Sequence, residues 1–393
     1  MIVRLQRLGM LPLILLACSP TRLAAAETSQ ALEAALKRAG ANRAQIEQAL
    51  QESSPEQQEG MQFLVLNMPD RDLQNLSSEF LRENVALAYR AWHEAPWKNR
   101  VSKELFLNEV LPYASVNEHR DKWRKEFYER CQPLVKDADA PGKAAVILNQ
   151  KIFELFKVHY STKRKKADQG PHDSIRTGLA SCTGLSVLLV DACRAVGVPA
   201  RFVGVPLWSD DSGNHSWVEV WDDGWHFTGA SEPAGEKLDQ AWFTGKASTA
   251  QRDNPSRAIY ATSFKRTPLS FPMVWAPEIN DVFAVNVTNR YTQHPAKLPE
   301  GFVQVMFRVV QRSGGDRVTA KLKVIRASGE VVFDGTTNDE RFDANDHLTA
   351  VVKANEKYKV EARYEGRTAT ATLDKSASNH LLTIPMETAT DTR

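Results

Sequence analysis

The spacing of apolar residues changes along the chain from a helical period to a strand period. In residues 31–38, 44–51 and 76–92, apolar side chains recur at helical spacing with charged side chains between them. This spacing is typical of amphipathic helices. We therefore expect residues 27–140 to form a helical N-terminal region, followed by another amphipathic helix over residues 144–158.

Beyond Pro299, apolar residues alternate with polar residues in short runs separated by turn signals. In the run 358–364, every second residue is apolar or aromatic and the residues between them are charged. Such alternation predicts strands, and a series of such runs predicts a β-sandwich of about seven strands over residues 299–388. Prolines mark an irregular connection before it, so residues 271–298 are assigned as a linker.

Between these two regions, one apolar run has both of its helix ends marked. Ser181, Cys182 and Thr183 lead into the run 185–196, which ends at Gly197. Hydroxyl groups can cap the free N–H groups at the start, and glycine suits a left-handed exit. Cys182 therefore lies at a helix N-terminus, where the partial positive charge favours the nucleophilic thiolate.

Two strands and a tight turn are predicted after this helix. Residues 200–205 form the first strand, and residues 215–221 form the second, which begins with His215 and carries Trp217 and Trp221 on the same face. An Asp-Gly pair at positions 223–224 predicts a hairpin turn, after which residues 225–228 return beside the second strand.

These segments resemble a known family. The features concerned are Cys-Thr-Gly at the helix start, Cys-Arg-Ala-Val-Gly-Val-Pro-Ala-Arg at its end, and His-Ser-Trp-Val-Glu-Val-Trp on the strand. Together they resemble the core of the transglutaminase-like superfamily, which contains transglutaminases, peptide N-glycanases and many bacterial cysteine-protease-like proteins. The resemblance implies a papain-like Cys-His-Asp arrangement, with Cys182 as the nucleophile and His215 as its base.

The resemblance also defines the expected fold class and domain organisation. We expect an α+β chain with a helical N-terminal region, a papain-like transglutaminase core over residues 141–270 and a C-terminal all-β sandwich. The sandwich either binds carbohydrate or a cell-surface polymer, or acts as a spacer. No exposed row of aromatic residues is evident in it, which favours the spacer.

The aspartate of the expected Cys-His-Asp arrangement is absent from its usual position. The family usually carries an aspartate a few residues after the tryptophan of the returning strand, and residues 228–232 contain none. A two-residue hairpin loop would place Glu232 opposite His215, whereas a three-residue loop would place Ser231 there. Glu232 is our candidate for the residue that orients the imidazole. Three alternatives stay open: Asn214, Asp210 and Asp211.

Several classes of site find no support in the sequence. There is no Cys-x-x-Cys or His-Glu-x-x-His motif, so no metal site is expected. Dinucleotide and phosphate-loop signatures are also absent, and we assign no cofactor. The formal net charge of +2 gives no argument for a nucleic-acid partner.

The N-terminus predicts export. Arg4 and Arg7 precede an apolar run over residues 8–18, and three alanines follow at 24–26. This pattern is typical of a signal peptide over residues 1–26, and the run is too short to span a membrane. The mature protein would then be periplasmic or extracellular. Alternatively, Leu-Leu-Ala-Cys ending at Cys18 resembles a lipobox, which would leave the protein anchored by a lipid on that cysteine.

Removal of Cys18 would leave three cysteines. Cys182 and Cys193 cannot easily pair, because eleven residues on one helix separate them by about 16 Å. A bridge between Cys131 and Cys193 would keep Cys182 reduced. Three free thiols are the equal alternative.

From these observations we expect an exported cysteine-dependent hydrolase that cleaves peptide or amide bonds through an acyl-enzyme. Its substrate would be a protein or peptide. One alternative is a protein-crosslinking transamidase, because an amine can replace water as the acceptor. Another is a catalytically silent cell-surface binding or scaffold protein, which the missing aspartate would favour.

Overall fold

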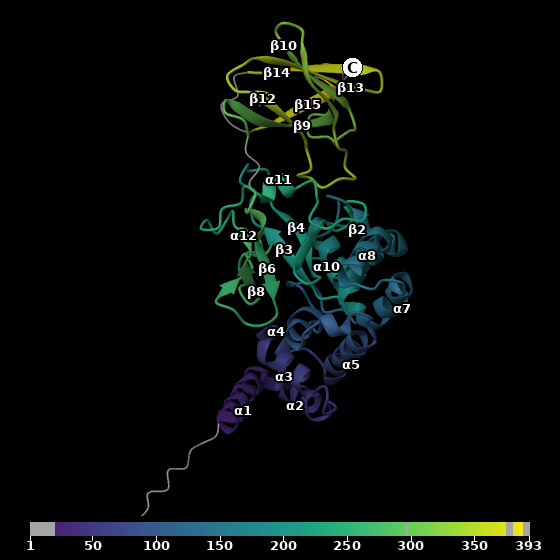
Figure 1. Cartoon of the computed structure of the whole chain (residues 1–393), viewed down its shortest axis with the longest axis vertical. Coiled ribbons are helices and arrows are strands. Elements are labelled where there is room, and N and C mark those ends of the chain that lie inside the picture. Colours follow the sequence, from purple (N-terminus) through teal and green to yellow (C-terminus); the bar gives the residue numbers. More distant parts are fainter. Residues whose placement is uncertain (1–19, 295–297, 375–379, 388–393) are drawn as a thin grey trace, which may run out of the picture.

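The computed structural model describes residues 20–294, 298–374 and 380–387. The predicted signal peptide falls largely outside these ranges, as does Cys18. Within them, no helix combines the length and the apolar character that crossing a membrane requires. Figure 1 shows three tiers, with helices at the bottom, a mixed core in the middle and a β-sandwich at the top. The chain thus has the predicted α+β class.

The N-terminal tier is helical, as the apolar spacing predicted. Ser77 caps the 17-residue helix α5 (Ser78–Glu94) by accepting a hydrogen bond from the N–H of Phe80 (3.1 Å). Val85 of α5 belongs to the same buried apolar cluster as Leu188 in the middle tier, so the two tiers share one core. The other helices are α1 (Pro20–Arg38), η1 (Gly40–Asn42), α2 (Arg43–Gln51), α3 (Gln58–Asn67), α4 (Asp70–Leu73), η2 (Lys98–Arg100), α6 (Lys103–Leu105), the π-helix η3 (Phe106–Val110) and α7 (Arg124–Val135).

The middle tier packs helices against an antiparallel sheet. Its central helix α10 (Cys182–Ala195) has nearly every residue buried. The sheet has the order β5-β4-β3-β6-β8-β7. Its strands are β3 (Ala200–Val205), β4 (His215–Trp221), β5 (Trp225–Thr228), β6 (Tyr260–Ser263), β7 (Leu269–Ser270) and β8 (Phe283–Asn286). The remaining elements are α8 (Pro141–Phe156), α9 (Pro171–Thr177), α11 (Thr244–Ala247), α12 (Thr288–Tyr291) and the short parallel pair β1 (His159–Tyr160) and β2 (Leu179–Ala180).

The predicted linker over residues 271–298 contributes to this sheet. Strand β8 pairs with β6, and the hydroxyl of Tyr291 in α12 accepts a hydrogen bond from the indole N–H of Trp217 on β4 (2.8 Å). Both elements are only four residues long. Such short elements carry too little periodicity to be recognised between prolines.

The C-terminal tier is a sandwich of two sheets in the described residues. The four-stranded sheet has the order β11-β10-β13-β14, and the three-stranded sheet has the order β12-β9-β15. Alternate residues of each sheet, such as Phe307, Leu322 and Val360, form a separate buried cluster between them. The strands are β9 (Phe302–Arg312), β10 (Lys321–Arg326), β11 (Val331–Thr336), β12 (Leu348–Lys353), β13 (Tyr358–Tyr364), β14 (Arg367–Leu373) and β15 (His380–Glu387).

The loop between β11 and β12, residues 337–347, docks the sandwich on the middle tier. The side-chain amide of Asn345 donates to the carbonyl of Asn214 (2.6 Å), and the N–H of Ala344 donates to the hydroxyl of Tyr160 (2.8 Å). An ion pair between Lys163 and Asp316 (2.9 Å) adds a contact at the rim. We call residues 337–347 the docking loop.

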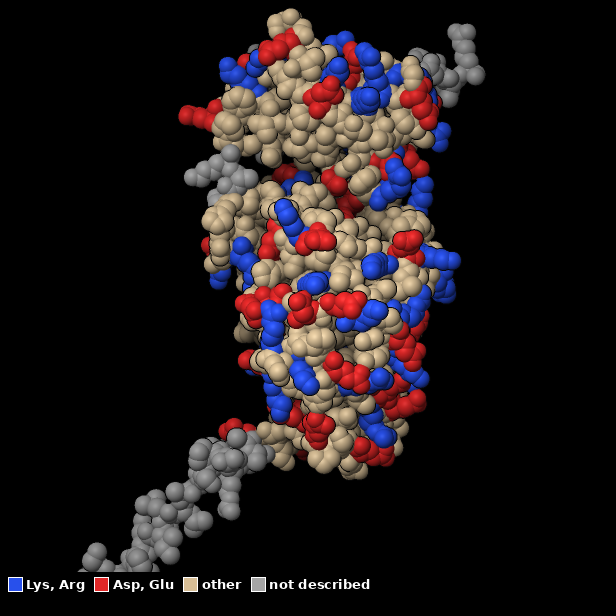
Figure 2. Space-filling view, turned by 45° about the vertical axis from the view of Figure 1, so that its right-hand side comes forward, with Lys and Arg blue, Asp and Glu red and all other residues tan. Residues whose placement is uncertain are grey.

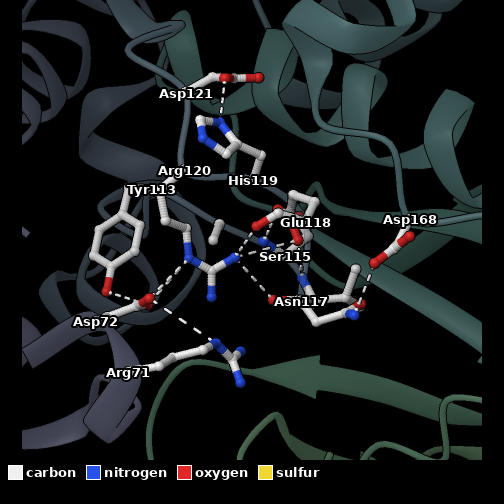
Figure 3. A network of polar contacts seen from close by, with 12 residues as sticks. Arg71, Asp72, Tyr113, Ser115, Asn117, Glu118, His119, Arg120, Asp121 and Asp168 are labelled. Atoms are coloured by element: carbon white, nitrogen blue, oxygen red, sulfur yellow. Dashed lines mark hydrogen bonds and ion pairs between the residues drawn. The ribbon is translucent and has the colours of Figure 1, made fainter. Parts of the chain in front are cut away.

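A buried polar network supports the irregular segment between the π-helix and α7 (Figure 3). Asp72 accepts from the hydroxyl of Tyr113 (2.8 Å) and from the guanidinium of Arg120 (3.1 Å). The side-chain amide of Asn117 donates to Asp168 (2.8 Å), which lies in the segment just before α9. The network therefore ties the N-terminal helices to the chain that leads into α10.

Charges of both signs are distributed over the surface. On the face drawn in Figure 2, blue basic and red acidic side chains intermingle over all three tiers. Many belong to ion pairs, such as Arg43 with Glu33 (2.9 Å) and Arg326 with Glu330 (2.7 Å). This face thus shows no large area of one sign.

Gly197, just after α10, provides a test of the packing between the lower tiers. It has a φ of +80°, and a Cβ atom there would lie 2.5 Å from the carbonyl oxygen of Ala91. Gly197→Ala is expected to lower the free energy of unfolding by about 3 kcal/mol, through left-handed strain and overpacking together. The matched control Gly40→Ala has φ +56° and no atom within 4 Å, and should cost only about 1 kcal/mol. Denaturant unfolding measures both values, and equal losses would contradict the proposed close approach.

Candidate active site

Cys182 is the first residue of α10, as predicted. The hydroxyl of Ser181 accepts from the N–H of Gly184 (3.2 Å) and donates to the carbonyl of Ala167 (2.8 Å). One side chain therefore caps the helix and fixes it to the segment that the buried network holds. Cys182 is partly exposed, whereas the helix residues after it are buried. The thiol thus lies at the positive end of the helix and is partly exposed.

His215 is the first residue of β4 and is almost completely buried, with 1% of its surface exposed. Its imidazole packs among aromatic rings, with ring centroids 4.9 Å from those of Trp242 and Phe243. The predicted nucleophile and base come together, because α10 crosses β4 at the strand end that carries His215.

A residue that the sequence analysis did not identify joins them. Oδ2 of Asp343, in the docking loop, lies 3.5 Å from Nδ1 of His215. One donor atom each of Cys182, His215 and Asp343 lie within 4.8 Å of one another. The N–H of Asn345 donates to Oδ1 of Asp343 (2.9 Å), and Arg317 donates to its backbone carbonyl (2.9 Å). The sandwich therefore supplies a buried, firmly held carboxylate to the site.

Glu232, the predicted acid, lies near the other nitrogen of the same imidazole. Its Oε2 is 4.0 Å from Nε2 of His215 and accepts from the indole N–H of Trp242 (2.8 Å). A Cβ atom at Gly229 would lie 2.4 Å from this oxygen. Gly229 belongs to the segment where the family's aspartate is expected, so the Glu232 carboxylate occupies space that a side chain there would need.

The backbone path that places Glu232 near His215 differs from the predicted one. Trp221 pairs with Trp225, so the hairpin loop has three residues and the two-residue count was wrong. By strand register alone, Ser231 would face His215. However, β5 ends at Thr228, and a bridge between Gly229 and Glu232 turns the chain back towards the imidazole.

The other candidate acids lie elsewhere. Asp210 pairs with Lys246 (2.5 Å), and Asp211 pairs with Arg257 (2.7 Å). Asn214 contributes its backbone carbonyl to the docking loop rather than to His215. The structure therefore brings two carboxylates to the imidazole, from Asp343 and Glu232.

These carboxylates differ in protonation. Burial would lower the pKa of His215, but the charges and hydrogen bonds of Asp343 and Cys182 together outweigh it and hold that pKa well above its ordinary value. Burial would raise the pKa of Asp343, but the His215 charge and hydrogen bonds hold it below its ordinary value. Burial raises the pKa of Glu232, and the Asp343 charge adds to this effect. The arrangement therefore favours an imidazolium–carboxylate pair of His215 and Asp343 beside a neutral Glu232.

A cavity of about 480 Å³ is lined by Asp343 and Glu232, the two carboxylates that approach His215. The middle tier contributes Tyr160, Leu185 and Trp242 to its wall, and the docking loop contributes Phe342 and Asp346. Because both domains line it, the position of the sandwich determines its shape. A cavity of this size suits a side chain or short peptide segment.

The remaining described cysteines are separate from this cavity. Cys131 and Cys193 are free and buried, so the structure shows the alternative of three free thiols rather than a bridge. Burial raises the pKa of Cys131 to about 12 and raises that of Cys193 further. Both therefore stay protonated at neutral pH.

The donors of Cys182, His215 and Asp343 also have the composition of a metal site. Within the described ranges, they form the single group of three or more potential ligand atoms at this spacing. A thiol, an imidazole and a carboxylate are all zinc ligands. Placement of the thiol at a helix N-terminus beside an imidazole equally suits a nucleophile.

Comparison with known proteins defines the class of this domain. Residues 128–229, which include Cys182 and His215, match the family model of the transglutaminase-like superfamily. The chain therefore contains a transglutaminase-like domain, and the resemblance seen in the sequence is confirmed. A comparison with curated proteins finds no match.

Three solved structures illustrate the similarity. A provisionally assigned cysteine protease from Cytophaga hutchinsonii is 16% identical, over 28% of this chain and 38% of that one, with a TM-score of 0.25. A provisionally assigned protease from Parabacteroides distasonis ATCC 8503 is 11% identical, over 62% and 36%, with a TM-score of 0.26. Red sea bream transglutaminase is 10% identical, over 72% and 66%, with a TM-score of 0.31. The chain thus spans less than two fifths of the first two structures.

The charge pair between the two domains can be tested by titration. Asp343→Asn removes the anion that stabilises the imidazolium, so the pKa of His215 should fall, by about 1 to 3. Glu232→Gln should change it less, because Glu232 is already neutral. The pH dependence of the His215 ring-proton signal in NMR spectra measures both. An unchanged titration in Asp343→Asn would show that the two charges are not coupled.

Proposed function

We propose that this protein is a cysteine-dependent acyl-transfer enzyme that hydrolyses peptide or amide bonds in proteins or peptides. The observation that carries the proposal is the meeting of Cys182, His215 and Asp343 within 4.8 Å at a helix N-terminus. A scaffold protein without activity would have no need for a buried imidazole held between a thiol and an ionised carboxylate.

In the acylation half of the reaction, His215 carries the proton that Cys182 has given up, so the sulfur is a thiolate. The sulfur attacks the substrate carbonyl carbon and forms a C–S bond, while the carbonyl oxygen becomes an oxyanion. The backbone N–H of Cys182, at the free end of α10, helps to stabilise that charge. His215 then donates its proton to the leaving nitrogen, the C–N bond breaks, and a thioester on Cys182 remains.

In the deacylation half, a water molecule enters and His215 accepts one of its protons. The hydroxide oxygen bonds to the thioester carbon, the C–S bond breaks, and the acid product leaves. His215 keeps this proton, which restores the thiolate–imidazolium pair for the next cycle. A primary amine in place of water would give transamidation, so the acceptor that the cavity admits decides between the two reactions.

The two carboxylates have different parts in this proposal. Asp343 stabilises the imidazolium that forms during both halves, because it is ionised and 3.5 Å from Nδ1. Glu232 orients the imidazole from the Nε2 side, as the sequence suggested, and its bond with Trp242 fixes its own position. The sandwich would then act as a part of the active site and not as a spacer.

The proposal also covers where the enzyme works. The charged and apolar pattern of residues 1–26 supports export to the periplasm or the extracellular space, with a lipid anchor at Cys18 as the alternative. Binding of a cell-surface polymer by the sandwich stays a prediction.

Selective alkylation tests the thiol–imidazole pair. Iodoacetamide should label Cys182 rapidly even at about pH 5 to 6, because the imidazolium of His215 stabilises the thiolate. Cys131 and Cys193 should stay unlabelled, since both are buried with raised pKa values. Peptide mass mapping over about pH 5 to 9 gives the rate at each cysteine.

His215→Ala is the control for this experiment and should abolish the labelling at acidic pH. Repetition with a chelator separates a free nucleophile from a metal-bound thiol, which would label only after the metal is removed. Slow labelling of Cys182 that is insensitive to both changes would rule out the proposed enzyme.

Turnover of peptide amides distinguishes the two carboxylates. Cys182→Ala should abolish turnover, and Asp343→Asn should reduce kcat by about a hundredfold through loss of imidazolium stabilisation. Glu232→Gln should reduce it less, because the neutral glutamine keeps the bond with Trp242. A larger loss of kcat in Glu232→Gln than in Asp343→Asn would assign the orienting role to Glu232 alone. Release of acid or incorporation of a fluorescent amine into casein then separates hydrolysis from transamidation.

A further inference from the structure

A second cavity, of about 710 Å³, lies at the opposite end of the sheet from Cys182 and His215. Strand β4 begins at His215 and ends at Trp221, which lines this cavity. Six residue steps of a strand separate the two ends by about 20 Å. Helix α3 and residues 102–109 form the facing wall. We call this cavity the tryptophan cleft.

Two indole rings form one wall of the tryptophan cleft. Trp221 and Trp225 are half-buried and meet edge to face, with centroids 5.6 Å apart at 77°. The guanidinium of Arg201 lies 3.7 Å from the centroid of Trp225 and is itself held by Glu219 (2.7 Å). A buried ion pair therefore fixes the orientation of Trp225, and the pair of rings is a rigid aromatic surface.

The cleft also contains a buried carboxylate with an unused oxygen. Glu109 is 3% exposed and sits on the π-helix η3, where the N–H of Leu111 donates to the carbonyl of Phe106 (2.9 Å). Oε1 of Glu109 accepts from Asn108 (2.7 Å), whereas Oε2 has no partner among the described residues. Buried polar atoms normally have a partner, and π-helical turns are frequent at functional sites. A ligand that donates a hydrogen bond to Oε2 would satisfy this oxygen.

The charges of the cleft exclude strongly ionic ligands. Three basic residues line it, Lys103, Arg201 and Lys265, together with three acidic residues, Glu59, Glu104 and Glu109. Lys103 and Glu59 neutralise each other (2.6 Å). A balanced site of this kind gives no net attraction for a phosphate or a polycation.

A neutral ligand with an apolar face and a polar edge fits these groups. A sugar ring presents C–H groups that stack on indole and hydroxyl groups that both donate and accept hydrogen bonds. A proline-rich peptide also stacks on aromatic surfaces, but proline lacks the N–H donor that Glu109 requires. We propose that the tryptophan cleft binds a neutral saccharide, whose ring packs against the indole pair of Trp221 and Trp225 and whose hydroxyl donates to Oε2 of Glu109.

This proposal is independent of the proposed catalysis. It places a saccharide about 20 Å from His215, at the other end of the same strand. Substrates that carry peptide and saccharide together would then engage both ends of β4.

Isothermal titration calorimetry of the full mature chain tests the proposal. The probes are neutral trisaccharides built from glucose, mannose, galactose or N-acetylglucosamine, with decaproline as the competing class. At least one trisaccharide should bind with a Kd of about 1 mM or tighter. Absence of heat with every trisaccharide, or binding of decaproline alone, overturns the proposal.

Two variants locate the binding. Trp221→Ala and Glu109→Gln should each weaken saccharide binding at least about tenfold, corresponding to 1.4 kcal/mol. The matched control Trp275→Ala removes a half-buried tryptophan outside the cleft and should leave the affinity unchanged. Alkylation of Cys182 in each variant confirms that the fold is intact. Equal affinity in Trp221→Ala and the parent chain would place the saccharide elsewhere and overturn the proposal.

Discussion

The contact between His215 and Asp343 is the interaction on which the site depends. Both side chains are 1% exposed, and each charge would be costly in its surroundings without the other. Because Asp343 belongs to the sandwich, this pair forms only when the docking loop lies against β4. The hydrogen bonds of Asn345 and Ala344 fix that position, so two domains with separate apolar cores contribute to one candidate site.

The thiol side of the site is fixed by a different set of contacts. Ser181 caps α10 and binds Ala167, and the network around Arg120 holds the chain before α9 through Asn117 and Asp168. The position of Cys182 therefore depends on the lower tiers, whereas the position of Asp343 depends on the upper tier. Such a division places the cavity between two bodies whose relative position controls its width.

The central sheet joins this site to the tryptophan cleft. Glu219, in the middle of β4, is fully buried and binds Arg201, Arg290 and Tyr291. These contacts hold the strand rigid between its two functional ends. A buried ionic cluster at that position has a structural reason, because the strand carries both an imidazole and an aromatic surface that require fixed orientations.

The sequence by itself determined the local features. Cys182 at a capped helix start, His215 at the start of a strand and the sandwich all follow from short-range periodicity and turn chemistry, which neighbouring residues specify. Tertiary structure decided the rest. Asp343 lies in an irregular loop with no periodic signal, and only the docking of the sandwich brings it to His215. The position of Glu232 depends on the hairpin loop, which has three residues and not two. Strand β8 is only four residues long. In both cases packing against the sheet, and not the local sequence, determines the structure.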